Sequence, residues 1–296
     1  MYSQITANKQ KTWALITIFL VVILALGYVM GLSSGSLYGP LTIAGLIAIV
    51  MALTGYYAGD KIALGLAGAY PISKTDNSYV WNLVENLCIS QGLPMPKVYL
   101  IPDQAMNAFA TGRDPQHSSI ALTQGLVAKL ANEELEGVIA HELSHIKNLD
   151  IRLGTLVIVL VGMIVILSDI FLRSQLFFGA GRRFGNQNNG SGVIMMVGLI
   201  LAILSPLIAN LIKLAISRKR EYLADAAGAL ATRYPEGLAR ALEKIAADGQ
   251  PLQRASQATA HLYISSPFGA GAKRMTKLLS THPPLAERVK ALRQMA

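Results

Sequence analysis

The feature that most constrains this chain is a long uncharged stretch near its start, because no charged residue occurs between Thr12 and Gly59. A membrane-spanning helix needs about 20 predominantly apolar residues, so the stretch is long enough for two of them. Residues 31–40 are rich in glycine and serine and end in proline, which predicts a turn in the middle. We therefore expect helices near 12–31 and 40–58 that form a membrane hairpin over residues 1–59.

The charges that flank this hairpin predict its orientation. Lys9 and Lys11 precede the first helix, and Lys61 follows the second. Positive residues are enriched on the cytoplasmic side of membrane proteins, so both ends are expected in the cytoplasm. A cleaved signal peptide is the alternative for the first segment. Its apolar run, however, is longer than a typical signal core, and no clear small-residue cleavage site precedes a soluble domain.

A second pair of membrane helices is expected within residues 153–216. Residues 153–168 are uncharged, and residues 193–212 form another apolar run. The joining residues 173–192 contain arginines, which the positive-inside tendency disfavours on the outer side. We favour two full crossings, and a hairpin that enters the membrane without crossing it is the alternative.

Residues 60–152 and 217–296 have ordinary polarity and are expected to be the two halves of one cytoplasmic domain. In the first half, short apolar runs bounded by proline, glycine and aspartate predict a small sheet, with strands at 97–101, 107–111 and 118–122. A free edge of such a sheet can hold an extended peptide through main-chain hydrogen bonds. The alternative is that these strands only build the core.

A metal-binding pattern lies at the end of the first half, in His141-Glu142-Leu-Ser-His145. Glu133 and Glu134 precede it and favour the start of a helix. On a helix, positions i and i+4 share a face, so His141 and His145 can bind one metal ion while Glu142 reaches the water beside it. This H-E-x-x-H pattern predicts zinc chemistry, although the bare match is only moderately specific.

A third ligand is expected in the second half, where Glu221 and Asp225 are four residues apart on one helical face. A catalytic zinc ion takes three protein ligands and keeps one open position, and two histidines with one glutamate are an accepted set. Glu221 would complete that set. The alternative is a solvated salt bridge, because Glu221 follows Lys219 and Arg220 and no spacing rule fixes a third ligand.

Four motifs in one order resemble those of the HtpX-type membrane zinc metalloproteases, relatives of the CAAX prenyl protease: Asn107-Ala-Phe-Ala, His141-Glu-Leu-Ser-His145, Glu221-Tyr-Leu-Ala-Asp225 and His282-Pro-Pro-Leu-Ala-Glu-Arg288. The resemblance covers nearly the whole chain. It implies an integral membrane protein, mainly α-helical with about four transmembrane helices, that carries an α+β zincin-type catalytic domain with a small β-sheet.

The resemblance also implies a role for each motif. One zinc ion per chain would bind His141, His145 and Glu221, and Glu142 would be the general base. Asp225 would accept a hydrogen bond from a ligating histidine, most simply His141.

Two further roles concern the substrate. The strand with Asn107, Ala108 and Phe109 would be the edge that receives the substrate. His282, held extended by the prolines that follow it, would stabilise the oxyanion. Arg288 is expected to brace the fold through a carboxylate.

Composition narrows the remaining possibilities. The chain is 52% hydrophobic and 15% charged, with a net charge of +9, which fits a membrane protein with basic cytoplasmic segments. No basic stripe with interleaved aromatic residues is present, so a nucleic acid partner is not expected. Cys88 is the only cysteine, which excludes an intrachain disulfide, and a small buried core residue is the simplest role for it.

The expected function is a zinc metalloendopeptidase of a bacterial-type inner membrane that cleaves membrane or misfolded proteins in quality control. Its partners would be protein or peptide substrates and the lipid bilayer, with the oligomeric state left open. Two alternatives stay open: a CAAX-type prenyl-protein peptidase, and a non-catalytic membrane scaffold with a structural zinc site. Structural zinc sites are closed by four protein ligands, whereas only three convincing ligands were found, which favours catalysis.

Overall fold

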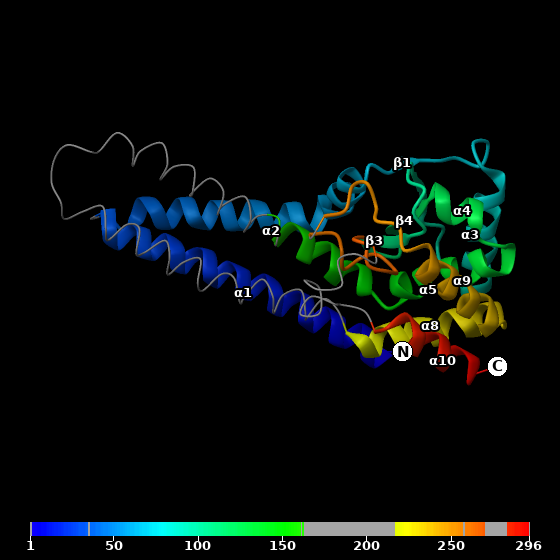
Figure 1. The fold of residues 1–296 in the computed structure, drawn as a ribbon. Coiled ribbons are helices and arrows are strands. Elements are labelled where there is room, and N and C mark those ends of the chain that lie inside the picture. Colours follow the sequence, from blue (N-terminus) through cyan, green and yellow to red (C-terminus); the bar gives the residue numbers. More distant parts are fainter. Residues whose placement is uncertain are drawn as a thin grey trace.

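Two long helices project side by side from the rest of the molecule (Figure 1). They are α1 (Tyr2–Ser34) and α2 (Tyr38–Ala67). Large apolar side chains on both helices face outward, and Trp13, Val21, Ile43 and Leu46 are 60–68% exposed. Such a surface suits lipid, where a helix satisfies all of its backbone hydrogen bonds internally. The computed structural model describes residues 2–34, 36–160, 162, 217–256, 258–269 and 283–295.

Both helices extend beyond the predicted ranges 12–31 and 40–58. The 33 residues of α1 give a length of about 50 Å, whereas the hydrocarbon core of a bilayer is about 30 Å thick. The predicted range for α1 was too short because apolar composition marks only the stretch suited to lipid. Residues 2–11 contain no glycine or proline that would separate them from the same helix. The start of α1 therefore reaches the domain that carries the remaining helices and the sheet (Figure 1).

Two segments of the described chain are long and apolar enough to cross a membrane, Ile5–Ala25 and Tyr38–Ala67. The second predicted pair, within residues 153–216, is described only at its start, where residues 150–160 are helical. Its apolar side chains, including Leu153 and Leu156, pack against Leu15 and Phe19 of α1. The expectation of four membrane helices falls largely outside the described residues.

The predicted small sheet is confirmed. Its strands are β1 (Tyr70–Pro71), β2 (Lys97–Ile101), β3 (Ala108–Asp114) and β4 (His117–Thr123), in the order β1-β2-β4-β3. β2 and β4 run parallel with Val98 opposite Ile120, and β3 pairs antiparallel with β4. β3 is the last strand in this order, so it lies at an edge of the sheet.

The remaining labelled helices are α3 (Ser78–Gln91), α4 (Gln124–Lys129), α5 (Asn132–Lys147), α8 (Arg218–Thr232), α9 (Pro235–Asp248) and α10 (Leu285–Arg293). The helix α5 is central, because it packs against β3, α8 and α9. Leu135, Val138, Ile139, Leu143 and Ile146 of α5 have no exposed surface. Burying each such side chain contributes about 1.5–3 kcal/mol, so the position of α5 is strongly fixed.

Two glycines allow the close approach of the helices around α5. A Cβ atom on Gly137 of α5 would lie 2.8 Å from the backbone nitrogen of Leu238 in α9. A Cβ atom on Gly228 of α8 would lie 3.1 Å from the backbone nitrogen of His141. Because a larger residue would push α8 away, Gly228 allows α8 to lie close to the backbone of His141 in α5.

Candidate metal centre

The two histidines of α5 lie one turn apart and face each other. His141 Nε2 and His145 Nε2 are separated by 3.2 Å, and the two rings are nearly perpendicular, at 87°. His141 is almost completely buried, with 1% of its surface exposed. Since both Nε2 atoms point to one place, the i and i+4 spacing has the geometry of a shared ligand site.

Glu221, in the first turn of α8, supplies the third group. Its Oε1 is 3.7 Å from His145 Nε2, and its Oε2 is 4.0 Å from His141 Nε2. The possible ligand atoms of His141, His145 and Glu221 all lie within 4.8 Å of one another. Ligand atoms arranged tetrahedrally around zinc, each about 2.0–2.2 Å from the ion, are roughly 3.4 Å apart. The residues present therefore fit a zinc ion, and two imidazoles with one carboxylate are a donor set that zinc accepts.

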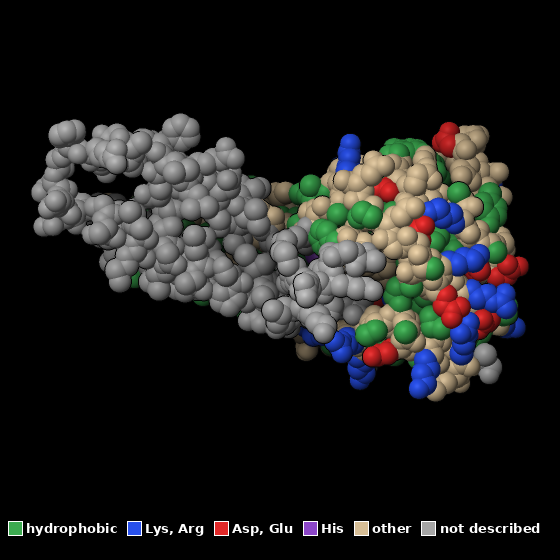
Figure 2. Space-filling view, viewed as in Figure 1, with side chains coloured by type: hydrophobic (Ala, Val, Ile, Leu, Met, Phe, Trp, Pro, Cys, Tyr) green, Lys and Arg blue, Asp and Glu red, His purple; other side chains and the backbone are tan. Residues whose placement is uncertain are grey.

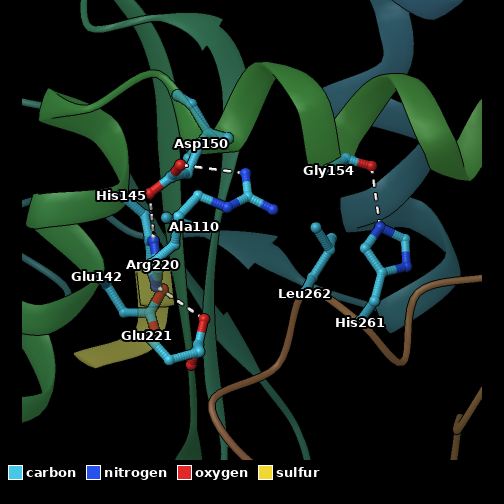
Figure 3. Close-up of a pocket in the computed structure, with 10 residues that line it drawn as sticks. Ala110, Glu142, His145, Asp150, Gly154, Arg220, Glu221, His261 and Leu262 are labelled. Carbon is cyan, nitrogen blue, oxygen red and sulfur yellow. Dashed lines mark hydrogen bonds and ion pairs between the residues drawn. The ribbon is translucent and has the colours of Figure 1, made fainter. Parts of the chain in front are cut away.

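Each histidine also contacts a carboxylate through its other ring nitrogen. His141 Nδ1 lies 2.9 Å from Asp225 Oδ1. His145 Nδ1 lies 3.0 Å from Asp150 Oδ2, and Figure 3 shows this second contact. A carboxylate in this place accepts a hydrogen bond from Nδ1–H, which fixes the proton on Nδ1 and leaves the Nε2 lone pair for a metal. The hydrogen bond to Asp150 and nearby carboxylates raise the pKa of His145 to about 9, against the lowering effect of burial.

Arg288 of α10 holds Asp225 in place. Its Nε donates to Asp225 Oδ2 at 2.8 Å, and its Nη2 donates to Oδ1 at 2.7 Å, while the whole side chain is buried. Burial alone would raise the pKa of Asp225, but the hydrogen bonds and charge of Arg288 hold this pKa below its usual range. Arg288 Nη1 also lies 3.6 Å from Glu221 Oε2. The predicted bracing of the fold by Arg288 thus has a carboxylate partner in the site itself.

Glu142 lies beside this cluster and is buried, with 1% of its surface exposed. It lines the same cavity as Ala110 of the edge strand β3. Burial raises the pKa of Glu142 to about 7. A carboxyl group with such a pKa can both accept and release a proton near neutral pH, which is what a general base needs.

A cavity opens at this cluster. Its wall includes Ala110, Glu142, His145, Glu221 and Leu262, which come from β3, α5, α8 and the segment before α10 (Figure 3). His261 also lines it and contacts Gly154 O through Nε2 at 3.0 Å. The cavity therefore gives a small group access to Glu142 and Glu221 next to the edge of the sheet.

The predicted substrate edge is partly covered by the chain itself. Ala108 O accepts a hydrogen bond from Ile264 N at 3.0 Å, and Asn107 Nδ2 donates to Ser265 O at 3.1 Å. Phe109 is fully buried and packs edge-on against Tyr263. An extended substrate can therefore pair with Asn107, Ala108 and Phe109 only if residues 263–265 move, whereas Ala110 already borders the cavity.

The sequence prediction and the described site do not match at two residues, His282 and Asp150. His282, the expected oxyanion donor, lies outside the described residues. Asp150 was not expected to be a ligand, because an aspartate five residues after His145 is more often a helix-terminal or loop residue. The helix is not continuous there, since Leu149 adopts a left-handed conformation with φ 60°. The only local signal for this break in the helix was the pair of polar residues Asn148 and Asp150 at the end of the helical pattern.

The comparisons with known proteins agree with this geometry. Residues 74–296 match the family described as Peptidase family M48. The protein named Protease HtpX homolog from Tropheryma whipplei (strain Twist) is 45% identical over 295 residues, covering 100% of this chain and 98% of the relative. The protein of the same name from Dictyoglomus turgidum is 46% identical, covering 99% of this chain and 94% of that relative.

A solved structure shares the fold. The crystal structure of S. mikatae Ste24p aligns with a TM-score of 0.51 at 21% sequence identity. The alignment covers 99% of this chain and 67% of that one. At this identity, the likeness speaks to the arrangement of the elements alone.

Proposed function

The chain belongs to peptidase family M48 and is a membrane-bound metalloprotease, and from this premise we propose that it is a zinc-dependent endopeptidase with its catalytic groups on α5 and α8. His141, His145 and Glu221 would hold the ion, and Glu142 would be the general base. The observation that carries this proposal is that these three donors lie within 4.8 Å of one another, at a cavity lined by His145, Glu221 and the buried Glu142.

The residues of the site suit hydrolysis without a covalent intermediate. Zinc, when bound, makes a water molecule acidic, with a pKa of roughly 7, and polarises a carbonyl group. Glu142 Oε would accept a proton from the attacking water and then deliver it to the leaving amine nitrogen. Asp225 and Asp150 would hold the histidines in the tautomer that keeps each Nε2 free of a proton.

The substrate is proposed to bind as an extended strand against the edge of β3. Asn107, Ala108 and Phe109 would form one part of this edge after residues 263–265 move aside, and Ala110 would continue it next to Glu142. His282 would donate a hydrogen bond to the oxyanion of the transition state. Main-chain pairing requires no particular sequence, which suits a protease that removes membrane or misfolded proteins.

The membrane arrangement is also a proposal. Residues 1–59 and 153–216 would be two membrane hairpins, and residues 60–152 and 217–296 would form the protease domain on the cytoplasmic side of a bacterial-type inner membrane. The outward apolar faces of α1 and α2 support this arrangement. The lysines that flank the first hairpin support the orientation. An even number of crossings between His145 and Glu221 would return both ligands to the same side.

The scaffold alternative has less support, because the described residues offer three ligand groups with a buried base rather than the four ligands of a closed structural site. The prenyl-peptidase alternative rests on the likeness to Ste24p, which shows the fold alone. The experiments below therefore test the endopeptidase proposal.

Zinc content and casein hydrolysis of the purified, full-length protein test this function. Glu142→Gln should keep about one zinc ion per chain and lose hydrolysis, because the amide retains the shape but cannot accept the proton. Glu221→Ala should lose the zinc itself. An exposed glutamate on α9, Glu243, provides the control, since Glu243→Gln should leave both measurements unchanged. Unchanged hydrolysis by Glu142→Gln would rule out this mechanism.

A further inference from the structure

The carboxylate of Asp150 joins three elements that are distant in the sequence. Its Oδ2 contacts His145 Nδ1 at the end of α5, and its Oδ1 accepts a hydrogen bond from Arg220 Nη1 at 3.2 Å, next to the proposed ligand Glu221 (Figure 3). The same Oδ1 accepts a hydrogen bond from Asn8 Nδ2 of α1 at 2.7 Å. One carboxylate, with 10% of its side-chain surface exposed, thus contacts the candidate ligand His145, the residue before Glu221, and the first membrane helix.

The side chain of Asn8 contacts both Asp150 and the residue that follows α5. Its side chain is 1% exposed, and its Nδ2 also donates to Asn148 O at 2.9 Å. An amide nitrogen carries two hydrogen atoms, so both bonds can form at once. Asn148 follows the last residue of α5, where a backbone carbonyl has no partner within the helix. The amide nitrogen of Asn8 therefore satisfies a backbone carbonyl at the end of α5 and also restrains the carboxylate of Asp150.

The turn that Asn8 restrains is one the chain adopts at a cost. Leu149, between Asn148 and Asp150, has a φ of 60°, a left-handed conformation that costs a leucine about 1–2 kcal/mol. This conformation interrupts the helix and returns Asp150 to the side of His145. A strained turn persists only when its surroundings fix it, and the contacts from α1 are part of those surroundings.

We infer that Asn8, in the N-terminal membrane helix, is a positioning residue of the metal centre that acts on His145 through Asp150. This inference rests on the proposed metal site. It extends that site beyond residues 74–296, the part that matches the peptidase family, to a helix that contributes no ligand. The first membrane helix is then a structural part of the active site as well as an anchor.

The test is a double-mutant cycle on zinc affinity, measured with the full-length protein in detergent by competition with a coloured chelator. Asp150→Ala should weaken zinc binding about 10- to 100-fold, the range for loss of a group that orients a ligand. Asn8→Ala should weaken it about fivefold, the factor that one ordinary hydrogen bond is worth. The double variant should bind no more weakly than Asp150→Ala alone, because Asn8 acts through Asp150.

Gln10→Ala, an exposed change two residues further along α1, is the matched control and should bind zinc like the wild type. Asn8→Leu keeps the branched shape of the side chain and favours the helix, so it replaces Asn8→Ala if that variant unfolds early. Wild-type affinity in the folded Asn8 variant would overturn the inference, and so would losses that simply add in the double variant. If His145→Ala also retains zinc, the metal site itself is wrong; if His145→Ala loses zinc, only the role of Asn8 fails.

Discussion

At the scale of single residues, the site depends on a buried ion pair beside the histidines. Arg288 has no exposed surface and makes two hydrogen bonds to Asp225, which in turn contacts His141. A buried ion pair adds little stability compared with an apolar pair, but removing one partner leaves a costly unpaired charge. Arg288 is therefore the residue outside the proposed ligand set whose loss should be felt most strongly.

We predict that Arg288→Met destabilises the folded protein by about 3–5 kcal/mol, because it leaves Asp225 buried without its cation. The measurement is the thermal unfolding of the full-length protein in detergent. Arg293 on the same helix is the control, since it pairs with Glu236 and Glu243 at the surface. Arg293→Met should change the unfolding temperature little, because exposed ion pairs contribute little. Equal unfolding temperatures for the two variants would contradict the prediction.

Cys88 carries a thiol that burial makes unreactive. Its thiol is 2% exposed on α3, and burial raises its pKa to about 11. The thiolate, which is the reactive form, is therefore scarce at neutral pH. We predict that the native protein is not labelled by a maleimide, whereas the unfolded protein is labelled fully. The control is Ile89→Cys in a Cys88→Ala background, because Ile89 is 74% exposed and should label quickly. Rapid labelling of native Cys88 would show that α3 opens readily.

At the scale of elements, the candidate site is formed where α5 meets α8, and α9 also packs against α5. The proposed metal ligands come from α5 and α8, so their distance depends on how closely these helices pack. Gly137 and Gly228 permit that packing, since a Cβ atom at either position would press on backbone atoms of the neighbouring helix. Backbone atoms cannot move aside as a flexible side chain can, so the spacing of the helices is set by these glycines.

For Gly137→Ala, two effects compete. Alanine favours a helix over glycine by about 1 kcal/mol, whereas overpacking a core costs about 1–3 kcal/mol. We predict net destabilisation, because the new Cβ would lie 2.8 and 2.9 Å from Leu238 N and Cα. Gly65→Ala in α2 is the control, since nothing lies within 4 Å of its new Cβ, and it should leave the protein as stable or more stable. Thermal unfolding of both variants measures the difference, and a more stable Gly137→Ala protein would show that α9 can shift freely.

At the scale of the whole molecule, the helical hairpin and the domain have different surfaces. Lys, Arg, Asp and Glu side chains gather on the domain, over the end that carries α9 and α10 (Figure 2). The outward side chains of α1 and α2 are apolar. A chain divided in this way places its domain in water and its hairpin in lipid. The start of α1 then lies where both environments meet, next to Asp150.

This division predicts the topology of the first hairpin. Reporter fusions at Ser36, between α1 and α2, and at Lys74, after α2, should report opposite sides of the membrane. Ser36 should be external and Lys74 cytoplasmic, because lysines flank the hairpin on the Lys74 side. Alkaline phosphatase and a fluorescent protein fused at each position provide the two readouts. The same side for both fusions would mean that the hairpin does not cross.

The sequence by itself determined what depends on local spacing. The uncharged run gave the two apolar helices, the alternation of short apolar runs gave the small sheet, and the i and i+4 histidines gave the shared face of α5. Membership of the peptidase family was also readable from four short motifs. These features were accessible because helix and strand periodicities place nearby residues on known faces, whatever the rest of the chain does.

Only the tertiary structure decided which distant groups meet. Asn8 contacts Asp150 across 142 positions, and Asn107 contacts Ser265 across 158 positions. No periodicity relates such residues, because their approach follows from the packing of whole helices around α5 and from one left-handed residue, Leu149. Asp150 was left out for this reason: its place after the helical pattern marks it only as a helix-terminal or loop residue, and the turn at Leu149 brings it to His145.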